Sequence, residues 1–530
     1  MTRRPPLNQL LANNSEFDVV VIGGGITGAG IAREAAGSGL RSLLVEQQDF
    51  AWGTSSRSSK MVHGGLRYLG SGQPGLAREA LRERERLIQE APGLVDPMPF
   101  IMPHYRGRFP GPRLFQLLLR VYDYLGKRRT RRFLQASDSL NWVPALSTRG
   151  LLGASVFADG VTDDARLVLR VLSEARADGA VCRNYTRAVN ILQRDGHVTG
   201  VSLQDGLDDQ HIDVKSRLVI NATGAWGGLP ETSSERSGGL TIRPLRGSHL
   251  VLPWHRLPVT CAVSVLHPED GRPVFAFPWQ GTTVLGTTDL DHDQNLAREP
   301  AISASEADYL LRIAAQLFPS RGISQQDILS TWSGVRPVVT DGTGKSPSRE
   351  NREHTIKADR GLVTIAGGKL TTFRQIAREA LSLGLGPDHR RTLRSESAAV
   401  FRPVPEVPRP TNLSHLAWQR LRGAYGPDLP ALLDEPQLTP VPGAEALWAE
   451  LTFACKAEQV VHLDDLLLRR TRLGLILPDG GECLLPQLRE HCQSVLGWTD
   501  QQWMDEVNRY RHLYQRAYSA APWPEEHHDR

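Results

Sequence analysis

The chain has 530 residues, with 62 lysines and arginines against 58 aspartates and glutamates, and a net charge of +4. This length predicts two or three domains, and so small a net charge gives no support to nucleic-acid binding. The five cysteines are scattered without a CxxC pair, which argues against a zinc site or a disulfide framework. The first residues lack the apolar core of a signal peptide, and no apolar run approaches the roughly 18 residues of a membrane span. We therefore expect a cytoplasmic protein with no metal site and no nucleic-acid partner.

The first predicted unit, residues 17–49, is a strand, a tight turn, a helix and a second strand. Its first strand, Val19 to Ile22, is a β-branched run typical of a strand buried on both faces. The turn carries a GxGxxG pattern formed by Gly23, Gly25 and Gly28. This spacing allows a tight turn, close approach of backbone to a pyrophosphate, and close packing of helix on strand. The second strand ends at Glu46, where an acid can accept hydrogen bonds from ribose hydroxyls, so a dinucleotide is predicted without a choice between FAD and NAD.

A serine-rich segment, SSRSSKMVHGGLRYL, follows at residues 55–69. It shows no helical or strand period, and it gathers hydroxyls, cations and two glycines in one loop. Small hydroxyl side chains donate hydrogen bonds without blocking a planar ring, so the loop is typical of a segment that contacts a ligand. A solvated linker is the alternative, although a linker has no need of the apolar Met61, Val62 and Leu66.

Two later segments also indicate parts of a nucleotide-binding fold. The segment SRLVINATGAW, residues 216–226, predicts a buried strand that ends in ATG. It resembles the strand that returns beside the first unit in two-dinucleotide-domain flavoproteins, and an ordinary strand-to-loop turn is the alternative. The segment GLVTIAGGKLTTFRQIAREAL, residues 361–381, predicts a strand, a glycine turn and an amphipathic helix. The N-terminus of that helix, where we expect Lys369, can face an anionic group.

Eight motifs occur in a fixed order along the chain. They are DVVVIGGGITGAGIAREAAGSGL, TSSRSSKMVHGGLRYL, TDDARLV, NATGAW, GSHLV, GTTD, SGVRP and GGKLTT. With them the chain resembles, from about residue 17 to its end, the FAD-dependent glycerol-3-phosphate dehydrogenases of the aerobic, respiratory type. The resemblance implies an α/β fold, in which an FAD-binding Rossmann-like domain is interleaved with an antiparallel-sheet substrate domain and followed by a C-terminal helical domain.

The resemblance also implies domain boundaries. An oxidoreductase domain would span residues 16–400, and a C-terminal helical cap would span 411–530 after the proline-rich linker RPVPEVPRP. Within the first domain the FAD-binding parts would be 16–95, 160–228 and 330–395, and the substrate-binding parts 96–159 and 229–329. We assign no chemistry to the cap.

The implied cofactor is FAD, bound non-covalently because no histidine or cysteine stands in a recognisable attachment motif. The residues that would hold it come from the glycine turn, the end of the second strand, the serine-rich segment and the later turns. In chain order they are Gly23, Gly25, Ile26, Thr27, Gly28, Glu46, Thr54, Ser55, Ser56, Ser58, Ser59, Lys60, Gly64, Gly65, Leu66, Thr223, Gly224, Gly334, Gly368, Lys369, Leu370 and Thr371.

The implied reaction is oxidation of sn-glycerol 3-phosphate to dihydroxyacetone phosphate by hydride transfer to FAD, with electrons passed on to a membrane quinone. The substrate would contact Arg67, Tyr68, His249, Arg336, Arg352 and Lys369. The planar fork of arginine matches phosphate oxygens, and Arg349 is an alternative to Arg352 as the outer phosphate ligand. The catalytic candidates are His249, Arg336 and Lys369, and which of them takes the hydroxyl proton stays open.

Other functions also stay open. An oxidase with the same substrate would reduce oxygen to hydrogen peroxide instead of a quinone. A flavin-fold protein that binds or acts on RNA is an alternative from another class. The oligomeric state is open as well, with a homodimer among the alternatives.

Residues 108–134 predict a helix that lies on a membrane surface. Leu114 to Leu125 is helical in pattern, with a polar stripe of Gln116, Arg120 and Asp123 and apolar residues on the remaining surface. A run of cations follows at Lys127, Arg128, Arg129, Arg131 and Arg132. Such a segment can bind an anionic lipid surface, which predicts peripheral attachment to the cytoplasmic membrane. The alternative is a buried helix of the substrate domain with a solvated basic end.

Overall fold

The predicted strand–turn–helix–strand unit lies in a six-stranded sheet of this computed structural model, which describes residue 4, residues 6–11, 16–227, 241–340, 354–386 and 393–520, and residue 523. The strand order is β19-β20-β12-β2-β3-β8, and every neighbouring pair is parallel except β19 with β20. The strands are β2 (Val19–Ile22), β3 (Ser42–Val45), β8 (Val181–Arg183), β12 (Val219–Asn221), β19 (Thr355–Asp359) and β20 (Leu362–Ala366). Both faces of β2 and β3 are buried, which explains their apolar sequences.

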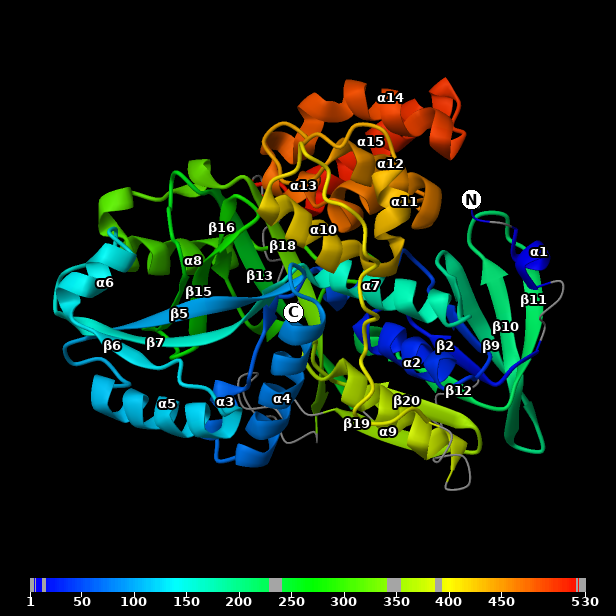
Figure 1. Ribbon diagram of the computed structural model, residues 1–530, viewed down its shortest axis with the longest axis horizontal. Coiled ribbons are helices and arrows are strands. Elements are labelled where there is room, and N and C mark those ends of the chain that lie inside the picture. The colour runs from blue at the N-terminus through cyan, green and yellow to red at the C-terminus, as the bar shows by residue number, and fades with distance from the viewer. Residues whose placement is uncertain are drawn as a thin grey trace.

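Helix α2 (Ile26–Gly37) packs against both α7 (Asp164–Ala177) and α9 (Phe373–Leu385) beside this sheet (Figure 1). The approach of α9 to α2 depends on Gly30, where an added Cβ would lie 2.7 Å from the Phe373 ring. Sheet and helices share one apolar core. The sequence predicted this parallel sheet and its first helix correctly.

The second large sheet has ten strands. Its main order is β17-β13-β16-β15-β14-β5-β7-β4, with β18 paired to β13 and β6 to β7, and only the β14–β5 pair is parallel. The strands are β4 (Met61–Val62), β5 (Val95–Tyr105), β6 (Arg132–Leu134), β7 (Leu151–Thr162), β13 (Thr241–Pro253), β14 (Ala262–Leu266), β15 (Pro273–Trp279), β16 (Thr282–Gly286), β17 (Leu290–Asp291) and β18 (Ser330–Thr340). Strands β4 and β18 join this sheet although their residues fall within the ranges predicted for FAD binding.

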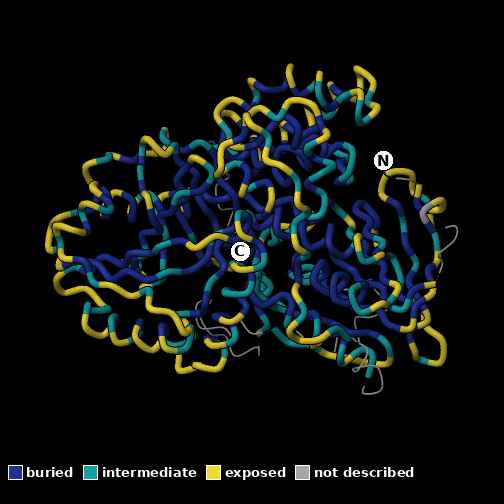
Figure 2. Tube along the Cα trace, in the orientation of Figure 1, coloured by how far each residue is buried: buried dark blue, intermediate teal, exposed yellow. Residues whose placement is uncertain are grey.

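The remaining elements before the C-terminal region surround the two large sheets. The helices are α1 (Leu7–Leu11), α3 (Leu66–Gly70), α4 (Pro74–Glu90), α5 (Pro112–Gly126), α6 (Ala136–Trp142) and α8 (Ala304–Leu317). A smaller sheet contains β1 (Glu16–Phe17), β9 (Thr186–Arg194), β10 (His197–Asp205) and β11 (His211–Ser216). Figure 2 shows the buried chain in the interior of the sheets and the exposed chain along the peripheral loops and helices.

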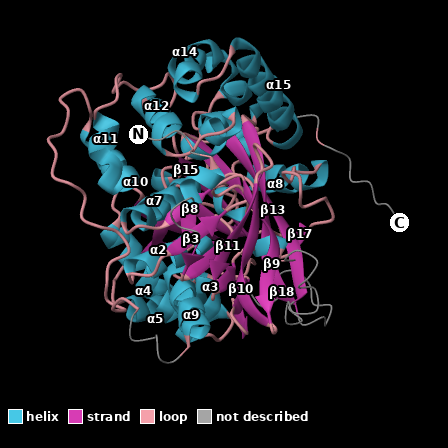
Figure 3. Cartoon of the chain, turned by 90° about the vertical axis from the view of Figure 1, so that its right-hand side faces the viewer, coloured by secondary structure: helices cyan, strands magenta, loops and turns pink. Residues whose placement is uncertain are grey.

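The C-terminal region is helical, as predicted, and Figure 3 shows it at one end of the strands. Its helices are α10 (His415–Tyr425), α11 (Leu429–Leu433), α12 (Trp448–Ala457), α13 (Leu473–Ile476), α14 (Leu485–Leu496) and α15 (Asp500–Ala517). Buried ion pairs attach it to the six-stranded sheet, because Arg469 and Arg470 both donate to Asp49 at 2.6 Å. In the described ranges, no helix is long and apolar enough to cross a bilayer. The architecture confirms the predicted α/β class with an interleaved sheet and a helical C-terminal region.

Candidate active site

The glycine turn between β2 and α2 leaves no room for side chains at two positions. Gly23 has φ +116°, and a Cβ there would lie 2.5 Å from the carbonyl oxygen of Ala222. A Cβ on Gly28 would lie 1.9 Å from the carbonyl oxygen of Gly23. The turn therefore brings β2, α2 and the end of β12 together at the carboxyl edge of the sheet.

The N-terminus of α2 fits a pyrophosphate group. Its N-cap is Gly25, which has no side chain to shield the first amides of the helix. The amide of Ile26 donates to Ser55 Oγ at 3.0 Å, which places the serine-rich segment beside this helix end. Glu46 accepts hydrogen bonds from the amides of Gly24 at 2.7 Å and Gln48 at 2.9 Å, and burial raises its pKa. The predicted phosphate and ribose residues thus occupy one edge of the sheet, as a dinucleotide requires.

The serine loop, defined here as residues 54–60, lies against strand β18. The Thr54 hydroxyl donates to the carbonyl oxygen of Val335. A Cβ on Gly334 would lie 2.4 Å from the carbonyl oxygen of Arg57, so only glycine allows this approach. Gly334, predicted to contact the cofactor, therefore directly supports the loop.

A buried carboxylate holds the second half of the serine loop. Asp164 Oδ2 accepts from the Ser58 amide at 2.9 Å and the Ser58 hydroxyl at 2.7 Å. Lys60 is fully buried, and its ammonium donates to Asp164 Oδ1 at 2.8 Å and to the carbonyl oxygen of Ser56 at 3.0 Å. The ammonium also stands 4.5 Å from the centre of the Trp332 ring. Burial lowers the pKa of Lys60 to about 8.

His249 is buried at the point where β13, β16 and β18 meet the serine loop. Its Nε2 lies 2.9 Å from Ser59 Oγ, and its ring stacks on Trp332 with 4.9 Å between centroids. Within the described part of the chain, its Nδ1 is buried without a hydrogen-bond partner. Burial lowers the pKa of His249 well below its usual value, and the charges of Arg336 and Lys60 lower it further. The imidazole is therefore neutral at pH 7, and one of its ring nitrogens has an unprotonated lone pair.

Arg336 lies near this imidazole, because it bonds to Thr287, and a Cβ on the preceding Gly286 would lie 2.3 Å from the His249 ring. Its Nη1 donates to Asp289 Oδ1 at 2.8 Å, and its Nη2 donates to Thr287 Oγ1 at 3.1 Å. The guanidinium lies over Gly247, where a Cβ would be 2.4 Å from Nη2. Two of the three predicted catalytic residues are thus brought together, and Arg336 is held with its planar fork oriented.

Gly64 and Gly65 turn the chain from β4 into α3, whose first residue is Leu66. The Gly64 amide donates to Asp159 Oδ1 at 2.8 Å, and Gly65 adopts φ +80°. Both glycines are buried. The turn fixes the direction in which α3 leaves β4.

Arg67, Tyr68 and Lys369 form a second group of predicted site residues. Lys369 Nζ lies 3.9 Å from the centre of the Tyr68 ring. Burial and, to a smaller extent, the charge of Arg67 together lower the pKa of Lys369 to about 8. The prediction that Lys369 begins a helix is wrong, because α9 begins four residues later, at Phe373. Lys369 lies instead in the preceding glycine turn.

The other predicted cofactor residues lie in the turns that follow β12 and β20. Thr223 and Gly224 continue from β12, and Gly224 adopts φ +63°. A Cβ on Gly368 would lie 3.8 Å from Thr27 Oγ1, which places this turn beside the start of α2. The same turn contains Leu370 and Thr371. The alternative outer phosphate ligands, Arg349 and Arg352, lie outside the described residues.

Sequence reasoning missed three residues that build this site. Asp164 belongs to the quoted TDDARLV motif, whose two adjacent acids gave it no distinct role. Trp332, directly before the SGVRP motif, stacks on His249, and its Nε1 donates to the Ser58 carbonyl oxygen at 3.2 Å. Arg472 reaches the serine loop from the C-terminal region, where Nη1 donates to the Ser56 carbonyl oxygen at 3.2 Å. No local sequence signal marks that arginine.

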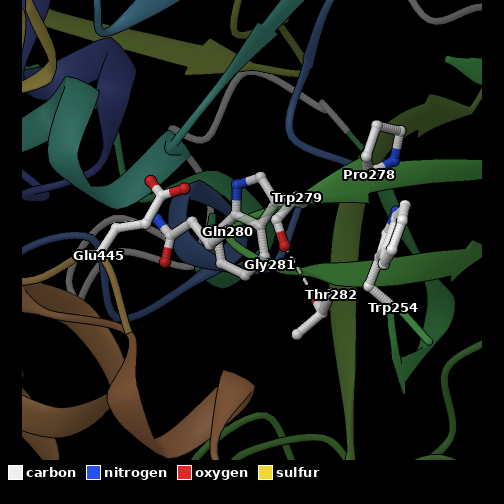
Figure 4. A pocket seen from close by; sticks show the side chains of 7 residues that line it. All are labelled: Trp254, Pro278, Trp279, Gln280, Gly281, Thr282 and Glu445. Atoms are coloured by element: carbon white, nitrogen blue, oxygen red, sulfur yellow. Dashed lines mark hydrogen bonds between the residues drawn. The ribbon is translucent and has the colours of Figure 1, made fainter. Parts of the chain in front are cut away.

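A surface cavity lies beside this site, at the β15–β16 turn (Figure 4). It is lined by Trp254, Pro278, Trp279, Gln280, Gly281, Thr282 and Glu445. Figure 4 shows Glu445, from the C-terminal region, and Trp254 on opposite sides of the turn. The Trp279 ring lies 5.0 Å from Lys60 Nζ, so the cavity wall backs onto the serine loop. In the described part of the chain, no predicted site residue lines this cavity.

The predicted surface helix exists as α5, but its faces differ from the prediction. Asp123, which belongs to the predicted polar stripe, is buried and accepts from the Thr130 amide at 3.1 Å and the Arg131 amide at 3.2 Å. The apolar Phe115, Leu119 and Tyr122 are buried in the protein. Four other apolar residues face solvent instead, at Leu114, Leu117, Val121 and Tyr124.

Comparison with known proteins identifies related chains over almost the whole length. Residues 18–374 match the family model described as FAD dependent oxidoreductase, and residues 364–503 match the C-terminal domain of alpha-glycerophosphate oxidase. The aerobic glycerol-3-phosphate dehydrogenase of Staphylococcus epidermidis is 32% identical over 86% of this chain and 87% of its own. The glycerol-3-phosphate dehydrogenase of Mycobacterium leprae is 35% identical over 93% of this chain and 87% of its own.

Two solved structures share the fold. The glycerol-3-phosphate dehydrogenase of Bacillus halodurans, complexed with FAD, has a TM-score of 0.74 and 25% identity, and the match covers 97% of this chain and 98% of that one. The dithionite-reduced L-alpha-glycerophosphate oxidase of Mycoplasma pneumoniae, with FAD bound, has a TM-score of 0.57 and 17% identity over 74% of this chain and 100% of that one.

Proposed function

Because the chain belongs to the FAD-dependent glycerol-3-phosphate dehydrogenase family, we propose that it oxidises sn-glycerol 3-phosphate to dihydroxyacetone phosphate and passes the electrons to a membrane quinone. FAD is its cofactor, as the sequence predicted. When bound, FAD supplies the acceptor of the hydride that leaves carbon 2 of the substrate. The residues of the glycine turn, Glu46 and the serine loop would hold it.

The main observation that supports this proposal is the neutral His249 beside Arg336. Oxidation of a secondary alcohol needs a group that takes the hydroxyl proton, and a neutral imidazole can do so at pH 7. The Ser59 contact at Nε2 fixes the ring, and the buried Nδ1 offers an unused polar atom. Arg336 is held by Asp289 and Thr287, so its fork can bind and orient an oxygen of the substrate without reorganising.

The second group of cations supports a phosphorylated substrate. Arg67 is exposed at the start of α3, while the partly buried Lys369 stands over Tyr68. Both cations offer donors to a phosphate, and the Tyr68 ring restricts the position of the lysine. We assign them to substrate binding, together with Arg336.

Anaerobic mixing with sn-glycerol 3-phosphate tests the proposal. The oxidised flavin absorbance should bleach within the dead time or over seconds, and dihydroxyacetone phosphate should form in an amount equal to the flavin. Glycerol at the same concentration should leave the flavin oxidised over the same period. A flavin that stays oxidised with the phosphate ester would refute the proposed substrate.

An oxidase is the second candidate, because the C-terminal match is to alpha-glycerophosphate oxidase. The two candidates differ in the acceptor alone. Reoxidation of the reduced enzyme by a soluble quinone analogue should be much faster than by dissolved oxygen, with little peroxide released per turnover. Stoichiometric peroxide with slow quinone reduction would favour the oxidase instead.

Delivery of electrons to a membrane quinone requires contact with a bilayer, and we propose that α5 makes it. Leu117 is 59% exposed and Tyr124 is 82% exposed, and they continue a row with Leu114 and Val121. Phe109, 73% exposed, precedes the helix. Exposed cations surround the row at Arg113, Arg120, Lys127, Arg128 and Arg129. Apolar side chains flanked by cations suit an anionic lipid surface.

Binding to vesicles that contain anionic lipid tests this surface. Replacement of Leu117, Val121 and Tyr124 by serine should lower vesicle binding and quinone reduction while activity with a soluble dye persists. Leu416 and Met504 provide a matched control, because both are exposed apolar side chains on helices of the C-terminal region, α10 and α15. Loss of binding in the Leu416→Ser/Met504→Ser variant, with full binding in the α5 variant, would place the anchor on the C-terminal helices.

A further inference from the structure

The C-terminal region reaches the serine loop through a buried side chain, Arg472. This residue stands directly before α13 with φ +61° and is 1% exposed. Its Nη1 donates to the carbonyl oxygen of Ser56 at 3.2 Å and to that of Leu468 at 2.7 Å. Its Nε donates to Asp163 Oδ1 at 3.0 Å, and its Nη2 donates to Asp164. One guanidinium therefore joins the C-terminal region, the serine loop and the start of α7.

Asp164 connects Arg472 to the residues around His249 through hydrogen bonds. The same carboxylate accepts from Arg472, from Lys60 at 2.8 Å and from Ser58 at 2.7 Å. The next residue after Ser58 is Ser59, whose hydroxyl lies 2.9 Å from Nε2 of His249. A short chain of hydrogen bonds and one peptide unit thus connects Arg472 to the proposed proton acceptor.

The charges in this cluster balance only when Arg472 is present. Two carboxylates, the partly buried Asp163 and the fully buried Asp164, face two buried cations, Lys60 and Arg472. Asp163 also accepts from the side-chain amide of Gln280 at 3.2 Å. Removal of the arginine would leave these two carboxylates, one of them fully buried, with a single cation, an arrangement that burial disfavours. The serine loop would have to move, or a carboxylate would have to take up a proton.

We propose that Arg472 is a positioning residue for the flavin site, through which the C-terminal region sets the position of the serine loop and, with it, of His249. The inference rests on the proposed function in one respect, namely that the serine loop contacts the flavin. Arg472 touches neither substrate nor reacting atoms in this assignment. It acts through Ser56 and Asp164.

Three variants of the full-length holoenzyme test this role. Arg472→Gln removes the charge and most of the donors, and Arg472→Lys keeps the charge but loses the fork. Arg420→Gln is the matched control, because Arg420 is paired within the C-terminal region, with Glu450 at 2.9 Å and the carbonyl oxygen of Glu445 at 2.8 Å. FAD affinity is measured by flavin fluorescence, and flavin reduction by anaerobic stopped flow with sn-glycerol 3-phosphate.

We expect Arg472→Gln to bind FAD at least about tenfold more weakly and to be reduced about 10- to 100-fold more slowly at saturating substrate. KM should change less than about threefold, because the substrate contacts remain. Arg472→Lys should recover part of both losses, and Arg420→Gln should resemble the wild type in both. Equal losses in the Arg472→Gln and Arg420→Gln variants, or wild-type values in Arg472→Gln, would overturn the proposal. If Arg472→Gln does not fold, the same comparison is made with Arg472→Lys, and a wild-type result there overturns it too.

The outcomes separate this inference from the proposed function. FAD affinity is measured without substrate, so weak binding in Arg472→Gln supports the inference even if wild-type flavin is not bleached by sn-glycerol 3-phosphate. In that case the proposed substrate fails and the positioning role stands. If wild-type flavin is bleached and the variant matches it in affinity and rate, the positioning role fails and the proposed function stands.

Discussion

Replacement of His249 by glutamine tests the proton acceptor while preserving most of the surroundings. Glutamine has a similar volume, and its amide can keep a hydrogen bond to Ser59, which the imidazole contacts at 2.9 Å. The stacking on Trp332, at 4.9 Å between centroids, would be lost. We expect the free energy of unfolding to fall by about 1–2 kcal/mol, the sum of a lost aromatic contact and a weakened hydrogen bond.

The loss in the rate of flavin reduction, expressed as activation free energy, should be larger than the loss in the free energy of unfolding. A positioned general base typically contributes about 10²- to 10⁴-fold, which corresponds to about 3–5 kcal/mol of activation free energy, and an amide cannot replace it. The assay is anaerobic stopped flow at saturating sn-glycerol 3-phosphate, with FAD content measured on the same sample. Since Ser59 and the rest of the loop remain, FAD content should stay near that of the wild type.

His104 provides the matched control for this experiment. It is also a buried histidine paired to a serine, with Nε2 2.7 Å from Ser155 Oγ, and burial lowers its pKa as well. His104→Gln should lose a similar amount of stability and reduce flavin at the wild-type rate. Wild-type rates in His249→Gln would refute the assignment and move the proton to Arg336, Lys369 or water.

The same variant tests how the free energy of unfolding depends on pH. The folded pKa of His249 lies well below 6.5, whereas the unfolded chain takes up the proton at about 6.5. Below pH 6.5 the unfolded state therefore binds more protons than the native state, and stability falls as the pH falls. One such proton changes the free energy of unfolding by at most about 1.4 kcal/mol per pH unit. Denaturant melts should show a shallower acid loss for His249→Gln than for the wild type.

Three further predictions concern the cofactor, the phosphate and the second cation group. Glu46→Ala removes the carboxylate that accepts from the Gly24 amide at 2.7 Å, so the Kd for FAD should rise about tenfold or more in fluorescence titrations; an unchanged Kd would contradict the ribose assignment. Glycerol should lose about 2–5 kcal/mol of transition-state stabilisation relative to its phosphate ester, because charged donors stay unpaired, and Arg336→Lys should lower kcat/KM for the ester; equal kcat/KM for both substrates would disprove the clamp. Flavin reduction should slow as pH rises through about 8, where Lys369 loses its proton, and Lys369→Arg should remove this limb from the pH profile; a limb that persists belongs to another group.

The elements that the sequence predicted best are those encoded by adjacent residues. The order of β2, α2 and β3 follows from an apolar run, three glycines and a second apolar run, all within about 30 residues. The glycine positions also agree with the structure, since Gly23 and Gly28 have no space for a Cβ. Local patterns of this kind specify the backbone conformation directly. The position of the site at the carboxyl edge of the sheet follows from that conformation.

Partners across the site could not be predicted, because they are far apart in the chain. Ser59 and His249 are separated by 190 residues, and Ser56 and Arg472 by 416. A serine-rich segment signals many donors but not which carboxylate will pair with them. For the same reason the C-terminal region received no role from its sequence, although one of its arginines touches the serine loop.

Helix α5 was predicted correctly as a helix, but the prediction of which side faces the protein was wrong. Positions 116, 120 and 123 share one side of the helix, and the pattern therefore predicted a polar stripe. The following turn reverses that outcome for Asp123, because the amides of residues 130 and 131 and the Thr130 hydroxyl all donate to its carboxylate and draw it inward. With the acid buried, the neighbouring Phe115, Leu119 and Tyr122 pack against the protein, and Leu117 and Tyr124 are left outside. The exposed apolar row thus depends on which side of α5 packs against the protein, and periodicity within the helix does not specify that side.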